Sequence, residues 1–212
     1  MSATAPKGLE FDPDAHLYRF AGKPAPGVSE MLSGLNIEDT TRFTDAGRDR
    51  GKAIHAALEY HMTGGVDWKT VDQRIMGYIE AGIEWLAAAG VKPGPGTFVE
   101  IPLYDPLRRF CGTPDLVCEC FGEPSVPDFK SGSLGEAGLR TALYELLARH
   151  NYPLPKGRTA RRRMAVQLFE DGRYKVTPLG DGFDYSYAES VISLYHRFIV
   201  NRKGEPRGNG KD

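Results

Sequence analysis

The sequence has few cysteines and no long hydrophobic run. Its cysteines are an odd set of three between positions 111 and 120, namely Cys111, Cys118 and Cys120, which excludes a disulfide framework and suits a reducing compartment. No stretch approaches the roughly 20 apolar residues needed to cross a bilayer, and the first residues resemble no secretory signal. We therefore expect a cytoplasmic protein without a membrane partner.

The net charge is also close to zero, because the sequence has 27 Lys and Arg residues and 28 Asp and Glu residues. Taken alone, this balance argues against a nucleic-acid partner. The charges are unevenly placed, however: residues 1–106 contain 10 basic and 15 acidic residues, and residues 107–212 contain 17 and 13. The densest basic stretch, residues 156–175, is a candidate for phosphate contacts, with a solvated loop as the alternative.

Length and a hydrophobic content of 41% predict one globular domain over residues 1–212. The apolar periodicity and the Gly and Pro breaks predict an α/β (α+β) order of elements. We expect a hairpin at 16–20, and a short helix that Ser29 caps and that extends to Leu35. Further helices are expected at 45–62, 70–89, 134–150 and 185–201, and strands at 98–104, 110–120, 125–129, 163–170 and 174–178. The domain then divides into an N-terminal part (1–45), a core (46–178), a C-terminal helix (179–202) and a disordered tail (203–212).

Polar residues gather at one place in the predicted strands. If the turn between two strands is centred on Gly122-Glu123, Asp115 faces Lys130, and Asp128 shares their side of the sheet. Two carboxylates this close suit a hard divalent cation such as Mg²⁺, and a neighbouring lysine can position or deprotonate a metal-bound water. An ordinary ion pair between neighbouring strands is the alternative, and for an isolated Asp-x-Lys it is the commoner one.

These residues resemble the PD-(D/E)XK nucleases, and specifically their RecB-like exonuclease branch. The similarity extends over residues 46–178 and consists of Gly51-Lys52-Ala53-Ile54-His55 with Glu59, then Gly112-Thr113-Pro114-Asp115, then Asp128-Phe129-Lys130, then a helix with Arg140 to Tyr144. The stretch from His16 to Ser29 is similar to the lead-in of phage-encoded members. The resemblance implies a restriction-endonuclease-like core with a central mixed β-sheet flanked by α-helices.

The resemblance also implies roles for individual residues. Metal binding falls to His55, Asp115 and Asp128 with the Phe129 carbonyl, Lys130 activates or orients the attacking water, and Glu100 is a further catalytic candidate in the outer sphere. Glu59 lies four residues after His55, on the same helix face, and is expected to hold the second imidazole nitrogen. Without the resemblance, His55 is more simply interpreted as a core histidine. The implied cofactor is Mg²⁺, with Mn²⁺ as a substitute, and no iron-sulfur cluster is expected.

Candidate DNA-binding residues come from two segments. Arg140 stands where the branch commonly has Gln, four residues before Tyr144, and both are candidates. The basic stretch adds Lys156, Arg161, Arg162 and Arg163, although alternation along a strand lets only some of the three arginines face one surface. Cys118 and Cys120 fall on the strand face opposite Asp115 and are expected to pack in the core.

The sequence therefore predicts a metal-dependent deoxyribonuclease. It would be an exonuclease acting on linear double-stranded or single-stranded DNA in phage-type recombination, repair or replication, in the host cytoplasm if phage-encoded, with a single-strand annealing or recombination protein as a candidate partner. A structure-specific endonuclease of the same fold and a non-catalytic DNA-binding module that retains the fold are the alternatives. A metallopeptidase is disfavoured because neither His55 nor His61 begins a His-Glu-x-x-His motif.

Overall fold

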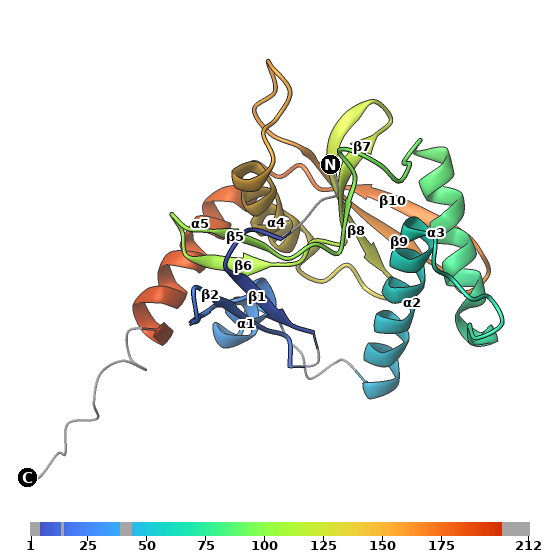
Figure 1. Ribbon diagram of the computed structural model, residues 1–212, viewed down its shortest axis with the longest axis horizontal. Helices are drawn as coiled ribbons and strands as arrows, with labels where there is room; N and C mark the ends of the chain where they lie inside the picture. The colour runs from blue at the N-terminus through green and yellow to red at the C-terminus, as the bar shows by residue number, and fades with distance from the viewer. Residues whose placement is uncertain (1–4, 14, 39–43, 201–212) are drawn as a thin grey trace, which may run out of the picture.

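The computed structural model of the chain describes residues 5–13, 15–38 and 44–200. At its centre is a five-stranded sheet with the order β10-β9-β8-β7-β4 (Figure 1). β8 and β9 run parallel and the other pairs are antiparallel. The strands are β4 (Phe98–Val99), β7 (Leu116–Cys120), β8 (Glu123–Lys130), β9 (Arg162–Leu168) and β10 (Tyr174–Pro178). The predicted α/β class with a mixed sheet flanked by helices is thus confirmed.

Helices cover both faces of this sheet (Figure 1). One layer contains α2 (Asp45–Thr63), the short η2 (Gln73–Ile75) and α3 (Met76–Ala88); the other contains α1 (Val28–Gly34), α4 (Ala137–Asn151) and α5 (Asp184–Tyr195), which continues as the π-helical η3 (His196–Val200). Alternation along β7 sends Cys118 into the first layer and Val117 into the second. Cys118 and Cys120 are buried as predicted. Among the described residues, no helix is both long and apolar enough to span a membrane.

The helix α2 matches its predicted range because its end signals are local. The Thr44 hydroxyl accepts a hydrogen bond from the Gly47 N–H at 3.1 Å, which caps the first turn. At the other end, Gly64 adopts a left-handed φ of 84°. α4 begins at Ala137, three residues later than predicted. The predicted tail, 203–212, lies outside the described residues.

A small N-terminal sheet packs beside the main one. It contains β1 (Leu9–Asp12), β2 (Leu17–Phe20) and β3 (Lys23–Ala25), of which β1 was not predicted. Its buried residues contact the hairpin formed by β5 (Leu103–Asp105) and β6 (Phe110–Gly112). The expected N-cap was wrong, because Gly27 occupies that position and the Ser29 hydroxyl accepts a hydrogen bond from Arg140.

Two predicted strands are each interrupted, and the interruptions position candidate site residues. The range 98–104 divides into β4 and β5 around Glu100, which has a φ of 46°. The range 110–120 divides into β6 and β7, and Asp115 immediately precedes β7. The Glu100 N–H donates to the Asp115 carbonyl at 3.1 Å, so the two interruptions lie side by side. Pro114 contributes to the second break because it has no N–H for a ladder hydrogen bond.

The predicted register of β7 and β8 was shifted by two residues. Cys120 pairs with Glu123, which leaves Phe121 and Gly122 as a two-residue turn with φ values of 52° and 74°. Two consecutive positive φ values are the requirement of the type I′ turn that suits hairpins. Extending the register places Asp115 opposite Asp128 rather than Lys130. Because the shift is even, all three side chains keep the shared face that was predicted.

Candidate metal centre

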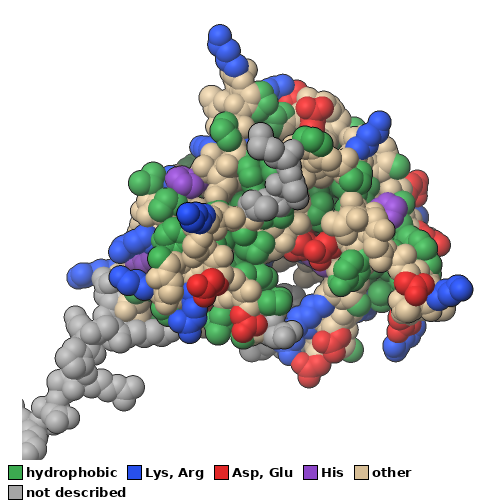
Figure 2. Space-filling view, in the orientation of Figure 1, with side chains coloured by type: hydrophobic (Ala, Val, Ile, Leu, Met, Phe, Trp, Pro, Cys, Tyr) green, Lys and Arg blue, Asp and Glu red, His purple; other side chains and the backbone are tan. Residues whose placement is uncertain are grey.

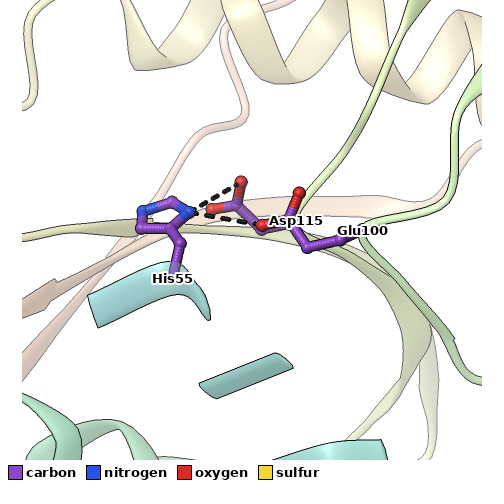
Figure 3. Close-up of side chains that lie close together, drawn as sticks. All are labelled: His55, Glu100 and Asp115. Atoms are coloured by element: carbon purple, nitrogen blue, oxygen red, sulfur yellow. Dashed lines mark hydrogen bonds and ion pairs between the residues drawn. The ribbon is translucent and has the colours of Figure 1, made fainter. Parts of the chain in front are cut away.

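Three side chains that could ligate a metal come together from three segments (Figure 3). His55 comes from α2, Glu100 follows β4, and Asp115 precedes β7. One ligand atom from each lies within 4.8 Å of the others. The His55 Nδ1 is 3.4 Å from both Glu100 Oε1 and Asp115 Oδ1. Such spacing leaves the donors close enough to share one cation.

The main chain of Phe129 holds two of these side chains in place. Its N–H donates to Asp115 Oδ2 at 2.7 Å. Its carbonyl oxygen lies 3.2 Å from His55 Nε2, and because a carbonyl can only accept, Nε2 carries the proton in this contact. The orientation of His55 and Asp115 is therefore set by the end of β8, and Nδ1 is the imidazole nitrogen that faces the carboxylates.

Burial and charge shift the pKa values of all three groups. Burial alone would lower the pKa of His55, but Asp115 and Glu100 outweigh it and raise this pKa well above its ordinary value. Burial would raise the pKa of Asp115. The positive charge of His55 and its hydrogen bond with Asp115 outweigh burial, so this pKa is lowered overall. Burial raises the pKa of Glu100 to about 7, against the opposing effect of His55. The cluster thus crowds negative charge that a protonated imidazole only partly neutralises, and a divalent cation would relieve this crowding.

Next to this cluster, Asp128 and Lys130 form an ion pair. Asp128 is 2% exposed, and its Oδ2 lies 2.5 Å from the Lys130 Nζ. Burial raises the pKa of Asp128 and Lys130 opposes the shift. Asp128, a predicted metal ligand, does not belong to the three-residue group and instead faces the ammonium.

Two predicted contacts of His55 differ from the structure. Glu59 does not hold the second imidazole nitrogen, because both ring nitrogens face Phe129, Glu100 and Asp115. The Phe129 carbonyl, expected as a metal ligand, accepts from His55 instead. Glu59 lines, with Glu100 and Asp115, a cavity of about 10 Å³, which is space for about one water molecule. Nothing larger than a water molecule therefore fits this cavity.

Four predicted DNA-binding residues are engaged inside the protein. The side chain of Arg140 is 13% exposed, forms an ion pair with Glu38 at 2.5 Å and donates to Ser29. Tyr144 is 7% exposed within the core on the α4 side of the sheet. Arg140 is thus paired within the protein and Tyr144 is buried, and their DNA contacts stay a prediction.

Arg161 and Arg163 are buried as well, and both are engaged within the protein. Arg161 Nη2 donates to the Tyr152 carbonyl at 2.6 Å, and Arg163 donates to the Gly138 carbonyl and pairs with Asp184. Alternation along β9 points both toward α4 and leaves Arg162 exposed.

Arg162 and Lys156 are exposed, but Arg162 lies far from the candidate metal centre. In the parallel register of β8 and β9, Arg162 pairs with Ser125, five residues before Lys130. At roughly 3.3 Å per residue this is a separation of about 16 Å along the strands. Arg162 therefore lies at the end of the sheet opposite the cluster of His55, Glu100 and Asp115.

The sequence did not indicate one contact beside the site. The Tyr18 hydroxyl of β2 lies 2.8 Å from Thr113 Oγ1, two residues before Asp115. These residues are 95 positions apart, so no local pattern could reveal the contact.

No protein-family model matches this sequence, and no curated protein matches it.

Proposed function

We propose that this protein is a metal-dependent deoxyribonuclease of the PD-(D/E)XK type that uses Mg²⁺ or Mn²⁺. The observation that carries the proposal is the convergence of His55, Glu100 and Asp115 within 4.8 Å, beside the ion pair of Asp128 and Lys130. A structural ion-pair network would explain the second feature but not the crowding of carboxylates around one imidazole. The combination supports hydrolysis of an anionic ester.

The donor set fits a hard divalent cation. Two carboxylates and one imidazole would hold it, and Asp128 lies on the neighbouring strand for an additional oxygen contact. Bound there, the cation would polarise a phosphoryl oxygen and lower the pKa of a water molecule. Binding would displace the imidazole proton, since a metal-ligating nitrogen must be unprotonated.

The protein's own residues would orient the reactants. Asp115 accepts the Phe129 N–H, which fixes one carboxylate oxygen and leaves the other facing His55. The Lys130 side chain is 23% exposed, so its ammonium can reach a phosphate that arrives from solvent. There it would orient the attacking water or stabilise negative charge that develops on the phosphate. Asp128 would keep this ammonium in position.

A cleavage assay tests the proposal. Purified protein should degrade linear DNA with Mg²⁺ or Mn²⁺ and stop when EDTA is added. We expect Lys130→Ala to lower the rate by about 10²-fold or more, as for other lost charge-stabilising groups. The matched control is Lys92→Ala, which removes an exposed lysine that belongs neither to the three-residue cluster nor to the ion pair of Asp128 and Lys130. Unchanged cleavage by Lys130→Ala would contradict the role of this lysine.

The same site is compatible with an exonuclease and with a structure-specific endonuclease. End-labelled linear, circular, single-stranded and flapped DNA distinguish them, because only an endonuclease cuts the circular or flapped substrates internally. Chelator-insensitive DNA binding without turnover on any substrate would instead select a non-catalytic binding module. A recombination or annealing protein remains the proposed partner class.

A further inference from the structure

A groove of about 830 Å³ lies between the N-terminal sheet, the β5–β6 hairpin and the end of α5. Its lining includes Leu17, Arg19, Phe20, Lys23, Tyr104 and Arg109. In Figure 2, Lys and Arg side chains gather along the left margin, over the part of the molecule where Figure 1 shows β2 and α5. No residue of the candidate metal centre lines this groove, so it is a separate surface.

The groove carries three exposed cations. Arg19, Lys23 and Arg109 are exposed, and none forms an ion pair with another described residue. In contrast, the adjacent Arg108 is paired with Glu189 at 2.7 Å. Glu30 is the one carboxylate that lines the groove among the described residues, and it accepts a hydrogen bond from the Tyr195 hydroxyl at 2.6 Å. The groove therefore has charge complementarity to an anion.

Apolar and aromatic side chains accompany these cations. Phe20 stacks on Tyr104 with ring centroids 4.0 Å apart, and both line the groove. Leu17 is 54% exposed on the outer face of β2, which it shares with Arg19. A single-stranded nucleic acid offers both matching chemistries, since its phosphates pair with Lys and Arg while its unpaired bases contact apolar and aromatic surfaces.

The β3 edge of the N-terminal sheet disfavours an added peptide strand. Phe20 and Lys23 close the two-residue turn Ala21-Gly22, whose φ values are 49° and 75°. In such a hairpin the closing residues, Phe20 and Lys23, exchange main-chain hydrogen bonds with each other. The main-chain groups of the next residue of β3, Pro24, then point away from β2, toward the open edge of the sheet. Proline has no N–H to donate there. An extended peptide would lose a main-chain hydrogen bond at the centre of this three-residue edge, whereas a nucleic acid does not need it.

β2 connects the groove with the candidate metal centre. Phe20 and Arg19 line the groove, and the hydroxyl of Tyr18 contacts Thr113, two residues before Asp115. At roughly 3.3 Å per residue, the four steps from Phe20 to His16 span about 13 Å, the reach of a few nucleotides. A strand bound in the groove can thus continue along β2 toward the cluster.

We propose that this groove binds single-stranded DNA and that β2 guides the strand toward the cluster of His55, Glu100 and Asp115. The proposal rests on the proposed nuclease function, because it assigns a substrate path to that site. It also replaces Arg140, Arg161 and Arg163 as the cationic contacts to DNA. The groove supplies exposed cations, whereas those three side chains are buried or paired within the protein.

Binding without cleavage tests the groove. Fluorescence anisotropy of a fluorescein-labelled oligothymidine with the full chain in EDTA measures affinity while turnover is blocked. We expect the double charge reversal Lys23→Glu/Arg109→Glu to weaken binding at least tenfold. The slope of log K against log salt should also become shallower by about 0.7 for each phosphate that the variant no longer neutralises. Phe20→Leu, which keeps the charges and removes one aromatic ring, should weaken binding severalfold without changing that slope.

The matched control is Lys69→Glu/Lys92→Glu, which reverses two exposed lysines outside the groove and changes the net charge equally. Thermal melting of each variant establishes that it is folded. Equal affinity of a folded Lys23→Glu/Arg109→Glu variant and the control would overturn the proposal. So would groove-dependent binding of an acidic, aromatic-containing peptide with no groove-dependent binding of the oligonucleotide. Cleavage by wild-type protein in Mg²⁺ is scored separately, so loss of nuclease activity in Asp115→Asn with normal binding tests the site alone.

Discussion

The Phe129 N–H donates a 2.7 Å hydrogen bond to Asp115 Oδ2. The carbonyl of the same Phe129 lies 3.2 Å from His55 Nε2. One residue of β8 thereby orients a carboxylate that precedes β7 and an imidazole from α2. The candidate ligands are held in place before any cation binds, which lowers the cost of organising the site.

Divalent cations should stabilise the folded protein through this cluster. A cation that binds only the native state adds about 2.7 kcal/mol to the free energy of unfolding at a concentration about 100 times its Kd. We expect Mn²⁺ to raise the melting temperature of the wild type, EDTA to reverse the rise, and Asp115→Asn to abolish it. Differential scanning fluorimetry measures the shift. The control is Glu119→Gln, an exposed carboxylate on β7, which should retain the full Mn²⁺ response.

The ion pair of Lys130 and Asp128 should also affect stability. Lys130→Met leaves the 2%-exposed carboxylate of Asp128 without its cation, a change that costs about 3 kcal/mol or more in comparable buried pairs. The double variant Asp128→Asn/Lys130→Met removes the stranded charge and should recover part of the stability. Urea unfolding without divalent cation measures both. A double variant less stable than Lys130→Met would contradict the burial argument.

Arg163 should act as a structural residue rather than a DNA contact. Its guanidinium donates to the Gly138 carbonyl and lies 2.9 Å from Asp184, so we expect Arg163→Met to lower the free energy of unfolding by about 3 kcal/mol. The neighbouring Arg162 is exposed, and Arg162→Met should change it by less than about 0.5 kcal/mol. Denaturant midpoints compare the two. Oligonucleotide affinity, measured where both variants are folded, should stay within about twofold of wild type, and a selective decrease in Arg163→Met would contradict this assignment.

Stability should fall below neutral pH in part through His196. Burial and the charge of Arg109 lower the pKa of His196, although its hydrogen bond with the Arg108 carbonyl opposes the shift. The unfolded chain therefore takes up the proton first, at the ordinary histidine pKa of 6.5. Above pH 6.5, His196 is neutral in both states and its burial does not reduce the free energy of unfolding. As the pH falls from there toward the lower folded pKa, protonation of the unfolded chain reduces the free energy of unfolding. Urea unfolding at about pH 7.5 and about pH 5.5, on either side of the histidine pKa, measures the loss of unfolding free energy on acidification. This loss should be smaller for His196→Gln than for the exposed control His150→Gln.

Elements with local signals could be predicted from the sequence. α2 was predicted to within one residue, because its apolar period and the stop at Gly64 are local signals. The shared face of Asp115, Asp128 and Lys130 was also predictable, because a side-chain period of two survives any even change of register. The register of the β7–β8 hairpin could not be predicted. Its two-residue turn needs a positive φ at both Phe121 and Gly122, and a phenylalanine gives no sequence signal for a positive φ.

By itself, the sequence determined the α/β class, the order of most elements and the strand face that carries the acidic residues, because these depend on neighbours a few positions apart. Tertiary structure decided that Glu100 joins His55 and Asp115, since 45 positions separate His55 on α2 from Glu100 beyond β4. It also decided which cations remain free: packing against α4 buries Arg161 and Arg163, whereas Arg19, Lys23 and Arg109 stay exposed along one groove. Burial and pairing of charges depend on contacts between distant segments, which a pattern of consecutive residues does not contain.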